Sequence, residues 1–233
     1  MSSDATYGAA ATAFNKKVNT SLSLSQTAGN KGGTFEAAGL IALQGATFSL
    51  TASANNLVGF TGADYFDGAL SANGTATFGG SDSLNGGDGI DTVAATLTGT
   101  SIRPALTAVE TVEITGITAA NTLDLSGSAG YTSLKSVSSS AAGLVTFNQI
   151  ASAATVSGAV VSAAGATFAF ADTALAGTTD SFALTLDGAT GTVTVNDQGG
   201  SNALETIAIN ATGGATVLTA FDLRSGVKRK SQT

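Results

Sequence analysis

From Ala46 onward the chain consists of short apolar or alternating segments, each the length of a β-strand, which Gly, Asn, Asp or Ser separates at rather even intervals. Examples are "TVAATL", "TVEIT", "TLDLS" and "SFALTL". Many short strands with turn residues between them are typical of a sandwich, a barrel or a parallel β-solenoid. Bulky residues are scarce, and a narrow solenoid interior filled by Ala, Val, Ile and Leu accommodates that better than a sandwich core does. We therefore predict a mainly β fold, a right-handed parallel β-solenoid or β-roll, over residues 46–223.

The composition narrows the classes of function. The 233 residues carry a formal net charge of −7, with a pI near 4.3, so no basic stripe is available to neutralise the phosphates of a nucleic acid. Divalent cations are the more natural counterpart. The chain has no Cys and no His, which removes disulfides, the commonest general base and the commonest zinc ligand. We predict a protein that is not an enzyme.

The two ends of the chain differ from the middle. Residues 1–45 include an amphipathic stretch with Phe14, Val18 and Leu22 on one helical face, which predicts a short helical segment and could be the end of an anchoring domain. Residues 224–233, "RSGVKRKSQT", predict a disordered basic tail. No cleavable signal and no membrane-spanning apolar run is visible, so we expect a protein that is not transmembrane and is exported without an N-terminal signal peptide.

Residues 59–94 divide into four units of nine: "GFTGADYFD", "GALSANGTA", "TFGGSDSLN" and "GGDGIDTVA". The last unit satisfies the pattern G-G-x-G-x-D-x-apolar-x at every specified position. Asp64, Asp82 and Asp91 share one column, in which the second unit has Asn73. Glycines permit backbone conformations that turn carbonyl oxygens inward, and aspartate adds carboxylate oxygens of the kind that Ca²⁺ prefers. Gly/Asp turns without a metal are the alternative interpretation; a phosphate cradle would need a following helix and a Lys, which the block lacks.

This block resembles the RTX calcium-binding nonapeptide repeat. In that family each nonad is a turn and a short strand, and two nonads make one coil of a parallel β-roll. The resemblance implies that Asp64 and Asp82 would flank one Ca²⁺ ion and that Asn73 and Asp91 would flank another. The candidate metal ligands are Asp64, Asn73, Asp82, Asp88, Asp91, Gly62, Gly80, Gly87 and Gly89.

The segment that follows the nonads, "GGDGIDTVAATLTGTSIRPALTAVETVEITG", is similar to the region after the calcium repeats in bacterial surface-layer (S-layer) proteins and related large secreted proteins. The resemblance implies a structural protein of the cell surface whose self-assembly into a sheet or lattice depends on calcium. Cell-surface polysaccharide is a further possible partner. The alternative is an adhesin or spacer module of a large RTX-type secreted protein.

Two further patterns bear on function. "LTAVETVEITG" and "NALETIAINATGG" share an apolar–Glu–Thr–apolar core, by chance or as related modules of a repetitive architecture. Among the carboxylate pairs, Glu110 and Glu113 are an odd number apart and would point to opposite faces of a strand, so they do not form an acid–base pair. A lyase that used Arg103 or Lys135 as its base is the remaining enzymatic alternative.

Overall fold

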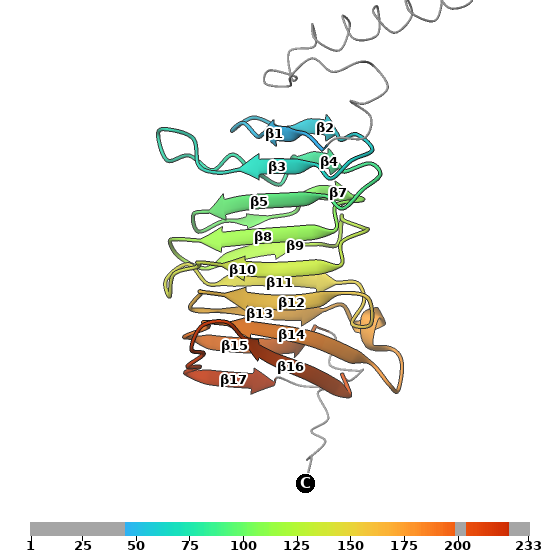
Figure 1. Ribbon diagram of the computed structural model, residues 1–233, viewed down its shortest axis with the longest axis vertical. Coiled ribbons are helices and arrows are strands. Elements are labelled where there is room, and N and C mark those ends of the chain that lie inside the picture. The colour runs from blue at the N-terminus through green and yellow to red at the C-terminus, as the bar shows by residue number, and fades with distance from the viewer. Residues whose placement is uncertain (1–44, 199–203, 224–233) are drawn as a thin grey trace, which may run out of the picture.

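The computed structural model describes residues 45–198 and 204–223. The predicted amino-terminal helix and the predicted basic tail lie outside the described residues. The described chain is a stack of short strands (Figure 1). The strands are β1 (Thr47–Ser49), β2 (Asn56–Val58), β3 (Tyr65–Gly68), β4 (Ser83–Asn85), β5 (Thr92–Leu97), β6 (Ser101–Ile102), β7 (Ala105–Thr107), β8 (Thr111–Gly116), β9 (Asn121–Asp124), β10 (Ser133–Val137), β11 (Val145–Ile150), β12 (Ser157–Val161), β13 (Gly165–Phe170), β14 (Ser181–Asp187), β15 (Thr192–Asp197), β16 (Thr206–Thr212) and β17 (Ala220–Leu223), with a short 3-10 helix at Asp172–Leu175.

The strands form three sheets in which every pairing is parallel. The long sheet has eight strands in the order β1-β3-β5-β8-β10-β12-β14-β16. The second sheet has six, in the order β17-β15-β13-β11-β9-β6, and the short sheet has three, in the order β2-β4-β7. Neighbours in each sheet come from successive coils of the chain, so the prediction of a mainly β parallel solenoid is confirmed.

Alternation within the strands places the core. In β5 and β8 every second residue is buried, and Val93 lies beside Val112, both with no exposed surface. Aromatic rings also stack along the axis: the Phe147 and Phe168 centroids are 5.4 Å apart. The sequence interpretation, which assigned the interior to small aliphatic residues, missed this use of phenylalanine. The fully buried phenylalanines are Phe66, Phe78, Phe147, Phe168, Phe170 and Phe182.

The corners between the sheets are tight. Several non-glycine residues there have φ between 47° and 51°, a left-handed conformation that turns the chain within one or two residues. They are Ala108, Ala119, Ser138 and Ser162. Gln149 has φ 59° and lies within β11, where the pairing with β13 is irregular. Within the described residues no helix is long and apolar enough to cross a membrane.

Candidate metal centre

The nonads do not make coils of constant length. β1 pairs with β3 so that Thr47 lies beside Tyr65, which closes a coil of two nonads. Tyr65 then pairs with Thr92, and Asn56 with Ser83, which in both cases spans three nonads. The first coil, which lies mostly before the block, thus has the length of two nonads, whereas the coils that the nonads themselves form have the length of three. The implied rule of two nonads per coil is therefore wrong for this block.

The extra residues of the longer coil belong to the second nonad, which forms a loop between β3 and β4. Asn73 is exposed there, and its Oδ1 accepts from the hydroxyl of Ser71 at 2.5 Å and from the backbone N–H of Thr75 at 3.3 Å. Asn73 thus closes a surface turn. It lies away from Asp64, Asp82 and Asp91, which occupy the same position in the other three nonads.

The structure brings Asp64 together with Asp91. The N–H of Ala46 donates to Asp64 Oδ1 at 2.6 Å, the N–H of Asp64 donates to Asp91 Oδ1 at 2.6 Å, and the N–H of Asp91 donates to Glu110 Oε2 at 2.8 Å. Each acidic side chain thereby binds the backbone of the coil before it. We call Asp64, Asp91 and Glu110 the carboxylate column. The implied pairs, Asp64 with Asp82 and Asn73 with Asp91, are wrong, because the looped-out nonad shifts the later units by one place.

Asp82 lies outside the carboxylate column, next to Asn55. Asp82 Oδ1 accepts from the N–H of Asn55 at 2.8 Å and from its Nδ2 at 3.0 Å, while Oδ2 accepts from the N–H of Gly79 at 2.7 Å. Both oxygens are therefore satisfied by protein donors, and Asp82 is 3% exposed. Asn55 was missed at the sequence level, although counting back nine residues from Asp64 finds it. On the coil that follows Asp82, the equivalent position is occupied by Pro104, the residue before Ala105 of β7.

Glycines let successive turns of the carboxylate column approach each other closely. Gly87 has φ +95° and Gly89 has φ +130°, values that favour glycine. A Cβ on Gly87 would lie 2.3 Å from the carbonyl oxygen of Phe60, and one on Gly89 would lie 2.7 Å from that of Gly62. Gly80 lies apart from this stack, against Arg103 of the next coil. The close stacking of the coils is therefore a sufficient reason for glycine at positions 87 and 89, whether or not a metal binds.

Asp91 differs from the other two aspartates. It has no exposed surface, and within the described residues its Oδ2 has no hydrogen-bond partner. The corresponding oxygen of Asp64 accepts from the N–H of Phe60, whereas the N–H of Gly87, one coil later, donates to Asn85 Oδ1 at 3.1 Å. Burial raises the pKa of Asp91, the N–H of Asp64 opposes that rise, and the charges of Asp64 and Glu110 add to it. The carboxylate is thus charged only at a cost in free energy unless a cation accompanies it.

The donors near Asp91 fit a hard cation in kind. A Cβ on Gly86 would lie 2.3 Å from Asp91 Oδ2 and 1.9 Å from the carbonyl oxygen of Ala108, so both oxygens pack closely against this glycine. Carboxylate and carbonyl oxygens are calcium ligands. No three acidic, His or Cys side chains in the described parts of the chain gather as a metal group, so backbone oxygens would complete the shell. Asp64 and Asp82 already bind backbone N–H groups, which leaves Asp91 as the carboxylate with a free oxygen.

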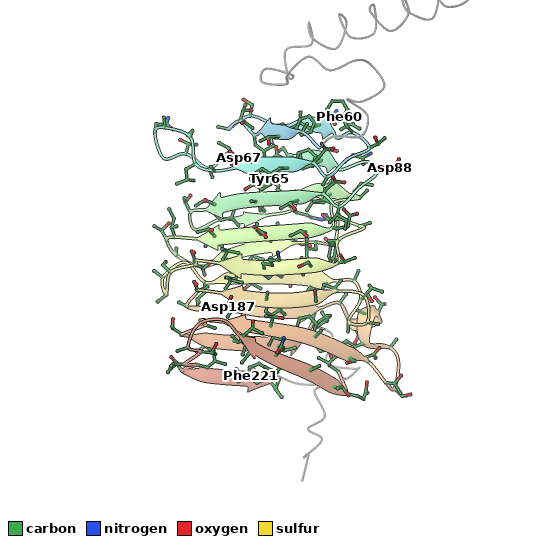
Figure 2. The ribbon with its side chains drawn as sticks, in the orientation of Figure 1. Phe60, Tyr65, Asp67, Asp88, Asp187 and Phe221 are labelled. Atoms are coloured by element: carbon green, nitrogen blue, oxygen red, sulfur yellow. The ribbon has the colours of Figure 1, made fainter. Side chains whose placement is uncertain are left out.

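Asp88 lies beside this turn on the surface. It is exposed and lines a hollow together with Gly59, Phe60, Thr61, Asn85 and Gly87. Its N–H donates to the carbonyl oxygen of Phe60 at 3.2 Å, and Figure 2 shows the two residues at the same end of the upper coils. Asp88 is therefore placed to face an ion that approaches from solvent.

The repeated Glu–Thr segments occupy equivalent places in the long sheet. Glu110 Oε2 accepts from the N–H of Asp91, and Glu205 Oε2 accepts from the N–H of Asp180, both at 2.8 Å. Each glutamate precedes a strand of the long sheet, β8 or β16, and binds the coil before it. The likeness between the two segments thus reflects one structural role.

The groups suggested for a lyase have other surroundings. Lys135 Nζ lies 2.8 Å from Glu113 Oε1 on the outer face of the long sheet, with both side chains about one-third exposed. Glu113 points outward from β8, whereas Glu110 lies in the corner before that strand, so the two do not face each other.

No protein-family model matches the chain, and searches of curated proteins and of solved structures found no match either.

Proposed function

We propose that this protein is a structural component of the bacterial cell surface, an S-layer-like protein that assembles with itself in a calcium-dependent way. The resemblance of its nonads to RTX repeats suggests the cation, and one observation supports it: the buried Oδ2 of Asp91, which has no hydrogen-bond partner within the described residues. A cation beside that oxygen would remove the cost of burying its charge.

The solenoid couples binding of the ion to folding. Asp91 meets its neighbours only when the coils stack, because Asp64 and Glu110 come from the coils on either side. A cation that binds the stacked coils but not the unfolded chain stabilises the fold by mass action. Extracellular calcium modules have dissociation constants of about 10⁻⁴–10⁻³ M, so the fold would tighten outside the cell and stay loose at cytosolic calcium levels.

The fold also suits a structural role. Its long sheet presents eight parallel strands in continuous register, which gives a regular outer surface of fixed spacing. A surface of this kind can bind the same surface of another copy, and such contacts can recur throughout an assembly.

The test is a calcium titration of the full chain after treatment with chelator, followed by calorimetry, far-UV circular dichroism and light scattering. Wild type should bind calcium, gain thermal stability and scatter more light. Asp91→Asn retains an oxygen for the N–H of Asp64 but removes the charge, so it should weaken calcium binding by about tenfold or more.

Asp67→Asn is the matched control for the calcium-binding measurement, because Asp67 lies outside the carboxylate column and its Oδ1 accepts only from the nearby N–H of Ala69. It should bind calcium as wild type does. A wild type whose heat signal, melting temperature and scattering all ignore calcium would refute the proposal, as would an Asp91→Asn variant that binds with wild-type affinity.

A further inference from the structure

The outer face of the long sheet is regular, and its central part carries mostly small side chains. Across β5, β8, β10 and β12 the outward residues lie in register, with Ala94 beside Glu113, Glu113 beside Lys135 and Lys135 beside Ala159. The flanking row is Thr92, Thr111, Ser133 and Ser157. The pairings of the long sheet contain no register shift, in contrast to the one between β11 and β13 of the second sheet. Short side chains on aligned strands make this face flat.

Charge distinguishes this face from the rest of the described chain. The described residues carry fourteen Asp and Glu but two basic residues, Arg103 and Lys135. Most surfaces of two copies would therefore repel each other. At the centre of this face, however, the charge of Glu113 is balanced by Lys135. The two other acidic residues that point outward from this sheet, Asp67 on β3 and Asp187 on β14, lie toward its ends, so two copies would meet less repulsion at the centre.

The position of this ion pair makes the face complementary to itself. β8 and β10 are the fourth and fifth of the eight strands, so the Glu113–Lys135 pair lies at the middle of the sheet. Consider a two-fold axis that lies in the interface, runs along the strands and passes between β8 and β10. It would place Glu113 of each copy over Lys135 of the other, which is an isologous contact.

The same operation matches the other outward residues by size. Ala94 on β5 would face Ala159 on β12, so the backbones could approach closely. Tyr65 on β3 is 40% exposed and would face Ala183 on β14, a large side chain over a small one.

We infer that this outer face binds the same face of a second copy, with the two solenoids antiparallel. The inference deepens the self-association in the proposed function and rests on it. Eight strands about 4.8 Å apart and five residues at about 3.3 Å each give roughly 630 Å² per copy. The total of about 1,260 Å² reaches the lower end of the range of specific protein interfaces and exceeds that of most crystal contacts.

Charge reversal tests the contact in a way that separates it from the ion pair within one chain. Glu113→Lys alone places Lys over Lys in the dimer, and Lys135→Glu alone places Glu over Glu. Each variant should weaken dimerisation by about tenfold or more, because like charges then oppose each other across the interface. In an equal mixture, a Glu113→Lys copy faces a Lys135→Glu copy, opposite charges meet twice, and a heterodimer should form.

The measurement is sedimentation velocity of the full chains, singly and mixed, in calcium and in chelator, with circular dichroism to verify the fold of each variant. Asp124→Lys is the control, because it makes the same charge change on β9 of the second sheet and should leave the dimer intact. A monomeric wild type, single variants that remain dimeric, or a mixture that stays dissociated would each overturn the inference. Failure of the calcium proposal would be seen separately, as the absence of calcium binding in calorimetry. Assembly through other surfaces would be seen as calcium-dependent light scattering that the Glu113→Lys substitution does not alter.

Discussion

The backbone N–H of Asp64 donates to Oδ1 of Asp91 at 2.6 Å, so one buried acidic residue binds the next along the solenoid axis. This contact joins two successive coils, and the other oxygen of Asp91, Oδ2, has no hydrogen-bond partner within the described residues. A structural role and the proposed role in cation binding thus fall to one side chain. Several consequences of that arrangement can be measured.

The first prediction concerns pH in the absence of calcium. Burial raises the pKa of Asp91 in the folded state, so folding favours its protonated form. The stability that Asp91 contributes is therefore present below its unfolded pKa and is lost as pH rises through its raised folded pKa. In chelator, the melting temperature of wild type should fall relative to that of Asp91→Asn across that interval.

Thermal melts of both proteins from acidic to neutral pH measure this difference, in which the contributions of the other carboxylates cancel. Added calcium should flatten it. A constant offset between the two proteins at every pH would show that Asp91 does not titrate as its burial requires.

The second prediction separates backbone strain from close packing at two glycines. Gly74 has φ +79° with no atom near the position of a Cβ, whereas Gly87 has φ +95° with the carbonyl oxygen of Phe60 2.3 Å away. Gly74→Ala should cost about 1–2 kcal/mol, the conformational penalty alone. Gly87→Ala should cost clearly more, because the coil before it must also move. Urea denaturation of the two variants measures the loss in free energy of unfolding for each. Equal losses would mean that the stacked turns can move apart without cost.

The sequence predicted the fold, the nonad phase and the glycine turns, because each depends on local pattern. It did not predict the coil lengths. The apolar position of the nonads holds Phe66, Leu84 and Val93, but the second unit has Thr75 there. Burying a threonine would contribute little apolar surface, so that unit loops out instead. The threonine was visible in the sequence. The burial of side chains decides whether a nonad joins the stack, and the nine-residue spacing alone does not show that burial.

The same distinction applies to Glu110. Its Glu–Thr pattern was visible in two places, yet its partner is the N–H of Asp91, nineteen residues earlier in the chain. Contacts between coils depend on coil length, and the local sequence does not contain that length.

The third prediction concerns the second glutamate of this kind. Glu205→Ala should cost about 1–3 kcal/mol, because it leaves the partly buried N–H of Asp180 without its acceptor. Glu205→Gln retains a side-chain carbonyl oxygen and should recover most of that loss. Chemical denaturation of both variants is the measurement. Glu113→Ala, which loses a partly exposed ion pair rather than an acceptor for a backbone N–H, is the control and should cost less than about 1 kcal/mol. If glutamine is as damaging as alanine, the hydrogen bond is not what Glu205 supplies.

The last prediction concerns the looped-out nonad. Deletion of Ala69–Thr77 removes nine residues and joins Gly68 to Phe78, which restores the two-nonad coil length seen between β1 and β3. Gly68 is kept because a Cβ there would lie 2.7 Å from that of Ala95, and Phe78 is kept because it is buried. Most of the deleted residues form a surface loop, and the buried Thr77 donates its hydroxyl to the carbonyl oxygen of Ala69 within the same segment. A shorter loop costs less entropy to close, so the variant should fold with wild-type circular dichroism. Deletion of Thr111–Ala119 is the control of equal length. It removes β8, which pairs with both β5 and β10, and should unfold the neighbouring coils, detected as faster amide hydrogen exchange in β5 and β10. If deletion of Ala69–Thr77 likewise speeds exchange in the strands beside it, β3 and β5, the second nonad is part of the stack, and the coil lengths described above do not account for stability.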